Sequence, residues 1–258
     1  MPPHAALHDP APPGAGSDRE GVAAAPDAEQ PAPLAGLAAP PEAVPDEAPA
    51  DTATFERVLD FLARYPSGPC FLALPSLSEA GEFRFEVFAA ETGSLDAFRS
   101  ALERETGALP NTTMKPVSPA QCRALDYAKA APAYPGFRLY FELPDRDIAS
   151  GARLAGRLGN SARQHVSLLV IDNTGLVQNL GTFLAFTRSG AEFAVPMTLT
   201  GTPVETLQLL VAIATAVPPA VLRDFTRGQA DAVFSAVAEE LRAAGATEDV
   251  AIVAFSLR

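Results

Sequence analysis

The stretch from His165 to Leu184 constrains the fold more than any other part of the chain. It opens with HVSLLVI, which is apolar on both faces of an extended backbone, as a strand covered on both sides must be. The tetrapeptide DNTG then provides the side chain and the glycine of a tight Asx-type turn, and the extended pattern resumes from Leu176. The stretch therefore predicts a β-hairpin at the centre of a hydrophobic core. This pattern indicates structure and not chemistry.

After residue 132 the chain alternates strand patterns with turn signals. Apolar runs recur at intervals of roughly ten to fifteen residues, a spacing typical of antiparallel sandwiches. An amphipathic helix is predicted over residues 231–244, and Gly245 ends it. We therefore predict an antiparallel β-sandwich domain over residues 133–258, with one late helix. Besides the hairpin, its strands are predicted at residues 137–143, 152–158, 193–199, 207–213 and 250–257.

Residues 53–132 alternate helices with strands. Thr54 and Ser94 are the predicted caps of two helices. Ser118 and Gln121 have the spacing of a capping box that opens a third helix, with Pro119 at its first position. The resulting order, α-β-β-α-β-α, predicts a small α/β sandwich-like unit before the β-sandwich, so the fold class of the whole chain is α+β. The strands of this unit are predicted at residues 70–77, 83–87 and 112–117.

The first 52 residues are predicted to be a disordered linker. Residues 1–50 contain 12 Pro and 15 Ala and no aromatic residue. Such a segment lacks the apolar volume that would offset the entropy of ordering it. We expect an extended, polyproline-like tether.

The charge of the chain argues against nucleic acid as a partner. The formal net charge is −12, with 19 Lys and Arg residues, whereas phosphate binding needs a basic face. Residues 1–50 carry 8 acidic residues and only Arg19, a net of −7, which leaves −5 for the other 208 residues. The predicted domains are therefore only mildly acidic.

The chain has neither the pattern of a signal peptide nor a membrane span. No basic region and apolar run follow Met1, and no stretch reaches 18 uninterrupted apolar residues. A long tether attached to nothing would be explained if Met1 were an internal start. We expect a periplasmic location if the N-terminus is that of a truncated receptor, and a cytoplasmic one otherwise.

Cys70 and Cys122 are the two cysteines of the chain, at the first strand and the last helix of the first unit. If the protein is exported, they are candidates for a disulfide that closes about fifty residues. In a cytosolic protein they would be two buried thiols, and the sequence leaves both readings open. A Cys70 nucleophile with His165 as its base is disfavoured, because the neighbours of Cys70 are apolar and would not lower the pKa of its thiol.

Two other groups of residues have the side chains of catalytic sites. His165, Ser167 and Asp172 are the residue types of a triad, but the first two lie on one face of one strand, so we interpret them as strand and turn residues. Asp145 and Asp147 flank Arg146, which favours a solvated turn with a local ion pair over paired carboxylates. DNTG lacks the later acidic ligands of an EF-hand, and we expect no metal or cofactor.

Eight motifs of the chain carry a resemblance: Gly68–Phe71, Leu95–Phe98, Pro119–Tyr127, Ser150–Leu154, His165–Gly175, Asn179–Leu180, Phe193–Pro196 and Leu207–Thr215. Through them, about residues 54–257 resemble a region of unknown function that lies near the C-termini of bacterial, rhizobial-type Hanks serine/threonine kinases and of caspase-like proteins. The family has no assigned catalytic or ligand residues. The chain contains no kinase core: a glycine-rich loop with its lysine, H-R-D and D-F-G are all missing from the sequence.

The resemblance and the domain pattern together imply a binding function. We expect a non-catalytic sensory or protein-interaction region associated with bacterial signalling, with an unknown protein or small-molecule ligand. The alternative is a small hydrolase or transferase that uses a cleft between the two domains, with Asp145, Asp147 and His165 near it. A third reading is a structural or secretion-accessory protein that packs against partners, which an exposed aromatic patch around Tyr134, Tyr140 and Phe141 would favour.

Overall fold

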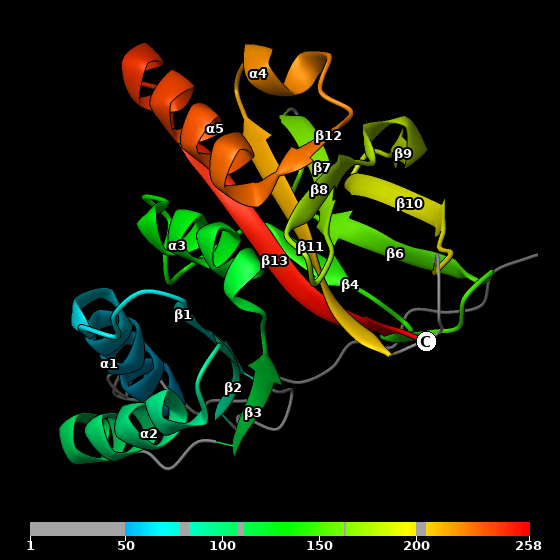
Figure 1. Cartoon of the computed structure of the whole chain (residues 1–258). Helices are drawn as coiled ribbons and strands as arrows, with labels where there is room; N and C mark the ends of the chain where they lie inside the picture. Colours follow the sequence, from blue (N-terminus) through cyan, green and yellow to red (C-terminus); the bar gives the residue numbers. More distant parts are fainter. Residues whose placement is uncertain (1–49, 78–82, 108–110, 163, 200–204) are drawn as a thin grey trace, which may run out of the picture. The chain divides into compact units, whose positions relative to one another are not determined.

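Two strands of ten residues, β11 (Thr206–Thr215) and β13 (Glu248–Leu257), form the centre of the fold. The computed structural model describes residues 50–77, 83–107, 111–162, 164–199 and 205–258 (Figure 1). β11 and β13 pair antiparallel along their whole length, from Thr206 opposite Leu257 to Thr215 opposite Glu248. They belong to a six-stranded sheet of order β12-β8-β7-β11-β13-β5. Its other strands are β5 (Asp147–Ile148), β7 (His165–Ile171), β8 (Leu176–Asn179) and β12 (Arg227–Gln229).

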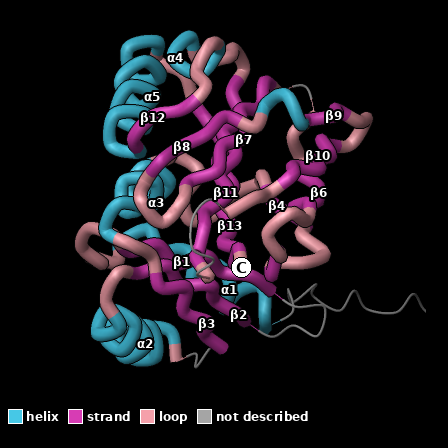
Figure 2. The backbone as a smooth tube through the Cα atoms, turned by 45° about the vertical axis from the view of Figure 1, so that its right-hand side comes forward, coloured by secondary structure: helices cyan, strands magenta, loops and turns pink. Residues whose placement is uncertain are grey.

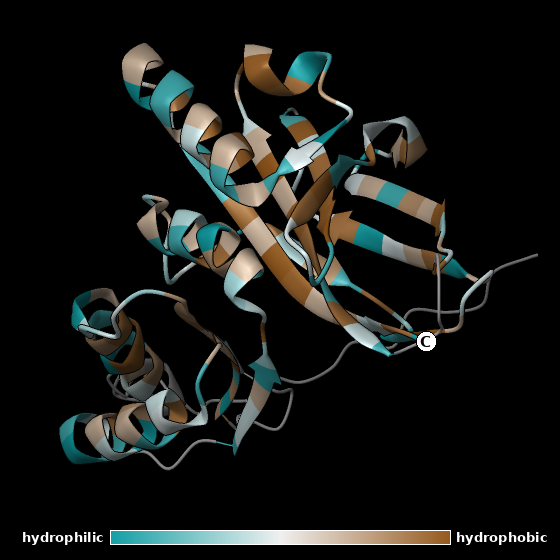
Figure 3. Ribbon diagram, viewed as in Figure 1, coloured by the Kyte–Doolittle hydropathy of each residue, from teal (hydrophilic) through white to brown (hydrophobic). Residues whose placement is uncertain are grey.

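The side chains of β11 alternate between two separate cores. Leu209 and Val211 face one core, which includes the helices, whereas Leu210 and Ala212 face a second sheet. This alternation follows from the two-residue repeat of an extended chain. Because both faces are covered, a strand in this position is expected to be apolar over most of its length, and Figure 3 shows β11 and β13 as mostly hydrophobic bands.

A second, four-stranded sheet completes a β-sandwich. Its order is β4-β6-β10-β9 (Figure 2), and all neighbours are antiparallel. Its inward residues pack against the six-stranded sheet. The α+β sandwich predicted from the sequence is therefore confirmed. The strands are β4 (Tyr140–Glu142), β6 (Arg153–Gly159), β9 (Leu184–Phe186) and β10 (Gly190–Pro196).

Helices cover the other face of the six-stranded sheet (Figure 1). The late helix is confirmed: Gly245 ends it in the left-handed region, at φ 59°, where a residue without Cβ is favoured. The Gln121 half of the predicted capping box is present, with Gln121 Oε1 3.0 Å from the amide nitrogen of Ser118. None of the described helices is long and apolar enough to cross a membrane. The helices of this layer are η1 (Pro119–Gln121), α3 (Cys122–Ala130), α4 (Ala220–Arg223) and α5 (Ala230–Ala244).

The residues before η1 form a three-stranded sheet with two helices on one face. β2 pairs antiparallel with β1 and parallel with β3, and the crossover between β2 and β3 is α2. The predicted order of elements is confirmed, but Ser94 is not the cap of α2, because the helix begins two residues earlier and Glu91 precedes it. The elements are α1 (Ala50–Arg64), β1 (Phe71–Leu77), β2 (Phe83–Ala89), α2 (Thr92–Thr106) and β3 (Asn111–Pro116).

The two faces of this small sheet serve different cores. Phe71 and Phe85 pack against α1 and α2, whereas Leu72 and Phe88 join the core that contains Val211 of β11. Residues on both sides of position 132 therefore share one hydrophobic core. The contacts group residues 46–258 into a single compact unit.

Two of the predicted strands are shorter in the structure. The strand expected over residues 137–143 is only β4, because Asp249 Oδ2 accepts the backbone N–H groups of Arg138 and Leu139 before it starts. The second strand of the hairpin, expected to reach Leu184, ends at Asn179. There the Asn179 side chain accepts the N–H of Gly181 and donates to the carbonyls of Leu222 and Phe225, and the chain crosses to the second sheet.

Candidate functional site

A cleft of about 650 Å³ lies between the two sheets of the sandwich. Its floor comes from β12, β8, β7, β11 and the end of β13, and its wall from η2 (Gly181–Phe183) and the end of β10. A volume of this size is within the range of small-molecule sites. The predicted hairpin, β7 with β8, supplies much of the floor.

Strand register places the floor residues next to one another. Arg227 is opposite Gln178, and Gln178 is opposite Val170, so these three side chains form a row across β12, β8 and β7. Leu209 of β11 pairs with Ile171 of β7 in the antiparallel sheet. The next residues beyond this pair are Gln208 and Asp172, so these two residues lie side by side. Thr206 is on the same face of β11, two residues before Gln208.

The inner end of the cleft contains polar groups that have no partner in the described protein. Gln208 is only 7% exposed, lines the cleft and makes no side-chain hydrogen bond to the described residues. Thr206 Oγ1 is covered and has no hydrogen-bond partner there either. Most buried polar groups are hydrogen-bonded, and leaving one unpaired costs about 1–3 kcal/mol. The Gln208 side chain is thus available to a molecule bound in the cleft, and Thr206 lies beside it in the lining.

The opposite wall is largely apolar. Val195 and Met197 are buried there, Leu199 is half-buried, and Phe183 remains 40% exposed at the rim. These side chains face the same space as the polar floor. The site can therefore accommodate a molecule with both apolar surface and hydrogen-bonding groups.

Asp172 shapes the rim of the cleft through the hairpin turn. Its Oδ1 accepts from Thr174 N at 2.8 Å, from Thr174 Oγ1 at 2.7 Å and from Leu176 N at 3.0 Å. These bonds confirm the predicted Asx-type turn. Gly175 adopts φ 80°, and a Cβ at this position would be 2.7 Å from the carbonyl oxygen of Ala120. The turn therefore requires glycine and fixes where Asp172 lies.

The residue types of a triad are not brought together. His165 is the first residue of β7 and pairs with Thr215, whereas Asp172 follows the last residue of that strand. His165 and Asp172 are seven residues apart along an extended chain, so their Cα atoms are separated by about 23 Å. His165 is also absent from the cleft lining, and Cys70 is disulfide-bonded.

The segment with Asp145 and Asp147 differs from its prediction. Arg146 makes no local pair with its neighbours; instead its Nη1 lies 2.8 and 3.1 Å from the two carboxylate oxygens of Glu86 on β2. Asp145 Oδ1 accepts the N–H of Asp147, and this turn leaves Arg146 directed at the small sheet. The local ion pair predicted for this turn was therefore wrong.

A smaller hollow of about 190 Å³ lies beside the Arg146–Glu86 pair, between the small sheet and β13. It is lined by Tyr140 and Phe141, but not by Asp145, Asp147 or His165. Tyr140 is 46% exposed, whereas the Phe141 ring is half-buried and packs edge-on against Phe193. In the described part of the chain, no group of three or more His, Cys, Asp or Glu residues is arranged to hold a metal ion.

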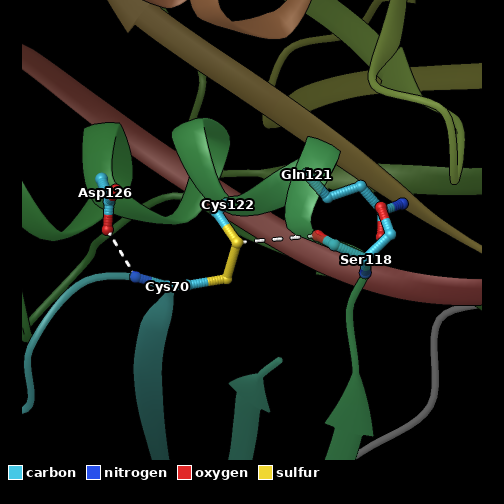
Figure 4. The surroundings of a disulfide bond; sticks show 5 residues. All are labelled: Cys70, Ser118, Gln121, Cys122 and Asp126. Carbon is cyan, nitrogen blue, oxygen red and sulfur yellow. Dashed lines mark hydrogen bonds between the residues drawn. A yellow bond between two sulfur atoms is a disulfide. The ribbon is translucent and has the colours of Figure 1, made fainter. Parts of the chain in front are cut away.

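The structure joins Cys70 and Cys122 in a disulfide (Figure 4), with their Cα atoms 4.5 Å apart. Cys70 has φ 56°, in the left-handed region, and its N–H donates to Asp126 Oδ1 on α3 at 2.9 Å. One residue before Cys122, Gln121 Nε2 donates to the carbonyl oxygens of Ile171 and Leu207. The same helix start thus contacts β1 through the disulfide and the two central cleft strands through Gln121.

The sequence predicted only part of this site. The hairpin and the turn role of Asp172 were predicted, whereas Gln208, Thr206 and Arg227 were not. A buried strand that contains a glutamine, TLQLLVAIAT, was the available signal, because glutamine is rarely buried without a reason. Arg227 lies in a strand of three residues, for which the sequence has no recognisable pattern.

No family model, no curated protein and no solved structure matches the chain. A proposal for the function of the cleft therefore rests on the residues that line it.

Proposed function

We propose that residues 54–258 form a non-catalytic sensory region of a bacterial signalling protein, and that the cleft between the two sheets is its ligand site. The observation that carries the proposal is a pair of polar side chains that line the cleft, the buried Gln208 and Thr206 with its covered Oγ1, neither of which has a side-chain partner in the described residues. The resemblance to regions that accompany serine/threonine kinases supports the signalling role.

A bound ligand would supply hydrogen bonds that no described residue offers to these two side chains. Each unpaired buried polar group costs about 1–3 kcal/mol, and a ligand that pairs with both groups recovers part of this cost. Water can fill the cleft of the free protein, and its displacement is favourable where the ligand reproduces the hydrogen bonds. The apolar wall adds affinity through buried area.

The strands of the cleft floor suit a sensor because hydrogen bonds connect them to the start of α3, outside the cleft. Gln121 holds the carbonyls of Ile171 and Leu207, which are adjacent to Asp172 and Gln208 of the floor. A change in the spacing of β7 and β11 would therefore be transmitted to the start of α3 and to the disulfide. Such a contiguous set of contacts is the physical route by which binding could alter a partner surface.

A fragment screen by NMR tests the proposal. Uniformly ¹⁵N-labelled protein is titrated with small polar fragments, and the amides of Thr206, Gln208 and Gln178 are expected to shift more than those of the small sheet. Gln178→Trp places a large ring on the exposed part of the floor and should abolish these shifts, whereas Gln164→Trp, at an exposed position outside the cleft, should not.

Two results would contradict the proposal. Fragments that perturb only amides outside the cleft would show that the cleft is not the site. Fragments whose binding survives Gln178→Trp would lead to the same conclusion, provided that the variant retains the thermal unfolding midpoint of the wild type.

A further inference from the structure

The cleft contains one positive and one negative side chain, at different places. Arg227 is its basic residue and Asp172 its acidic residue among the described lining residues. Asp172 Oδ1 is already occupied by three donors from the hairpin turn. The Arg227 guanidinium, by contrast, has no ion pair or hydrogen bond with the described residues and is exposed at the outer end of the floor.

A free guanidinium beside an amide is a site for a carboxylate. Its planar fork matches the two oxygens of a carboxylate, and Gln178, opposite Arg227 in the sheet, can donate a further hydrogen bond. A dianionic phosphate would be less suitable, because a single cation faces it and the Asp172 carboxylate borders the same cleft. The outer end of the floor therefore favours a monoanion.

The inner end favours a neutral hydrogen-bonding group. The Thr206 hydroxyl and the Gln208 amide both donate and accept, and neither is charged. Val195, Met197 and Leu257 surround them, so a charged group placed there would lose its hydration without a counter-ion. A hydroxyl or an amide on the ligand can pair with both groups.

The two ends are separated by the width of three strand spacings. Arg227, Gln178, Val170 and Leu210 form a row across four adjacent strands that spans about 14 Å. Gln208 lies two residues further along β11, so the backbone positions of Arg227 and Gln208 are about 16 Å apart. Both the arginine and the glutamine side chains extend into the cleft from these positions. An extended chain of about eight carbon atoms fits between them, next to the apolar wall.

From this arrangement, and on the basis of the ligand site proposed above, we infer that the cleft binds an elongated carboxylic acid with a neutral hydrogen-bonding group at its far end. The carboxylate pairs with Arg227 and Gln178. The far hydroxyl or amide pairs with Thr206 and Gln208, and the apolar middle lies along Val195 and Met197.

Three probes of one length separate the contributions of the two ends. ω-Hydroxyoctanoate has both groups, octanoate lacks the far hydroxyl, and octanediol lacks the carboxylate. Isothermal titration calorimetry should rank ω-hydroxyoctanoate above both. Arg227→Met is expected to weaken the two acids about tenfold and to leave octanediol unchanged, because a hydrogen bond to a charged group is the stronger kind.

Thr206→Val removes the hydroxyl without changing the volume. It is expected to weaken ω-hydroxyoctanoate and octanediol about fivefold and to leave octanoate unchanged. Arg99→Met, at an exposed position on α2 away from the cleft, is the matched control and should change none of the three affinities.

The outcomes distinguish the ligand class from the site. Equal binding of octanediol and ω-hydroxyoctanoate, or acids that are insensitive to Arg227→Met, would overturn the assignment of the carboxylate. If none of the probes binds while fragments still shift the cleft amides, the ligand class is wrong and the site remains. Probe binding that survives Gln178→Trp would overturn both the assigned ligand class and the cleft as the ligand site.

Discussion

Gln121 Nε2 lies 3.1 Å from the carbonyl oxygen of Leu207, and this hydrogen bond joins the start of α3 to the strand that carries Thr206 and Gln208. Gln121 is fully buried, and the same nitrogen also donates to the carbonyl of Ile171 at 3.3 Å. Its other side-chain atom, Oε1, accepts the N–H of Ser118. One side chain therefore satisfies three backbone groups in three different segments.

Replacing Gln121 should destabilise the protein and loosen the cleft. Gln121→Leu leaves the three backbone groups without this partner, and we expect a loss of about 2–3 kcal/mol in the free energy of unfolding. Urea denaturation measures this loss, and hydrogen exchange should accelerate at Thr206 and Gln208. Gln164→Leu, at an exposed position, is the control. A change below about 0.5 kcal/mol for Gln121→Leu would show that water replaces the lost bonds.

Removing the disulfide should have a larger effect. Cys70 and Cys122 are 52 residues apart, so in the chain-entropy picture the bond contributes about 4 kcal/mol by restricting the unfolded chain. The double variant Cys70→Ser/Cys122→Ser should lose this amount in urea denaturation, and reduced wild-type protein should behave in the same way. If oxidised and reduced wild type unfold at the same urea concentration, the bond does not stabilise the fold.

Two glycines should respond oppositely to alanine. Gly175→Ala is expected to cost about 2 kcal/mol or more, because the new Cβ would meet the carbonyl oxygen of Ala120 at 2.7 Å and the backbone has φ 80°. Gly93→Ala, in α2, meets nothing within 4 Å and should stabilise the protein by a few tenths of a kcal/mol or more. Thermal unfolding of both variants checks the pair, and similar shifts in the same direction would contradict the expected difference.

The contact between α5 and α4 should depend on acid pH. Glu240 accepts the N–H groups of Val221 and Ala220, and these hydrogen bonds hold the pKa of its carboxyl below the ordinary value of 4.5. A group with a lowered pKa stabilises the fold above its unfolded value, and the contribution is lost as the pH falls through the folded value. The contact should therefore persist at pH 4.5 and weaken below it.

Amide chemical shifts of Ala220 and Val221 follow this titration directly. Their midpoint should lie below pH 4.5, and Glu240→Gln should abolish the transition. Glu239→Gln, on the neighbouring exposed position of α5, should leave it in place. A midpoint at or above 4.5 would show that the two amides do not stabilise the ionised carboxylate.

The elements of this protein follow from local chemistry that can be read in the sequence. The hairpin turn needs Asp172 and Gly175 within four residues, and the end of α5 needs Gly245, so both features were predicted correctly. The apolar runs of β7, β11 and β13 likewise indicate strands that are covered on both faces. These signals act over a few residues, where side-chain type determines backbone conformation.

The cleft was decided only by the tertiary structure. Arg227, Gln178 and Gln208 come from three strands and Asp172 directly follows a fourth, and they share one face because of the register between those strands. Register depends on which residues pair across the sheet, and that information is spread over some 60 residues of sequence. β8 also ends at Asn179 because the side chain of this residue donates to the carbonyls of Leu222 and Phe225, which are distant in the sequence. Local pattern thus determined the strands, whereas long-range pairing determined which of their polar side chains meet in one cleft.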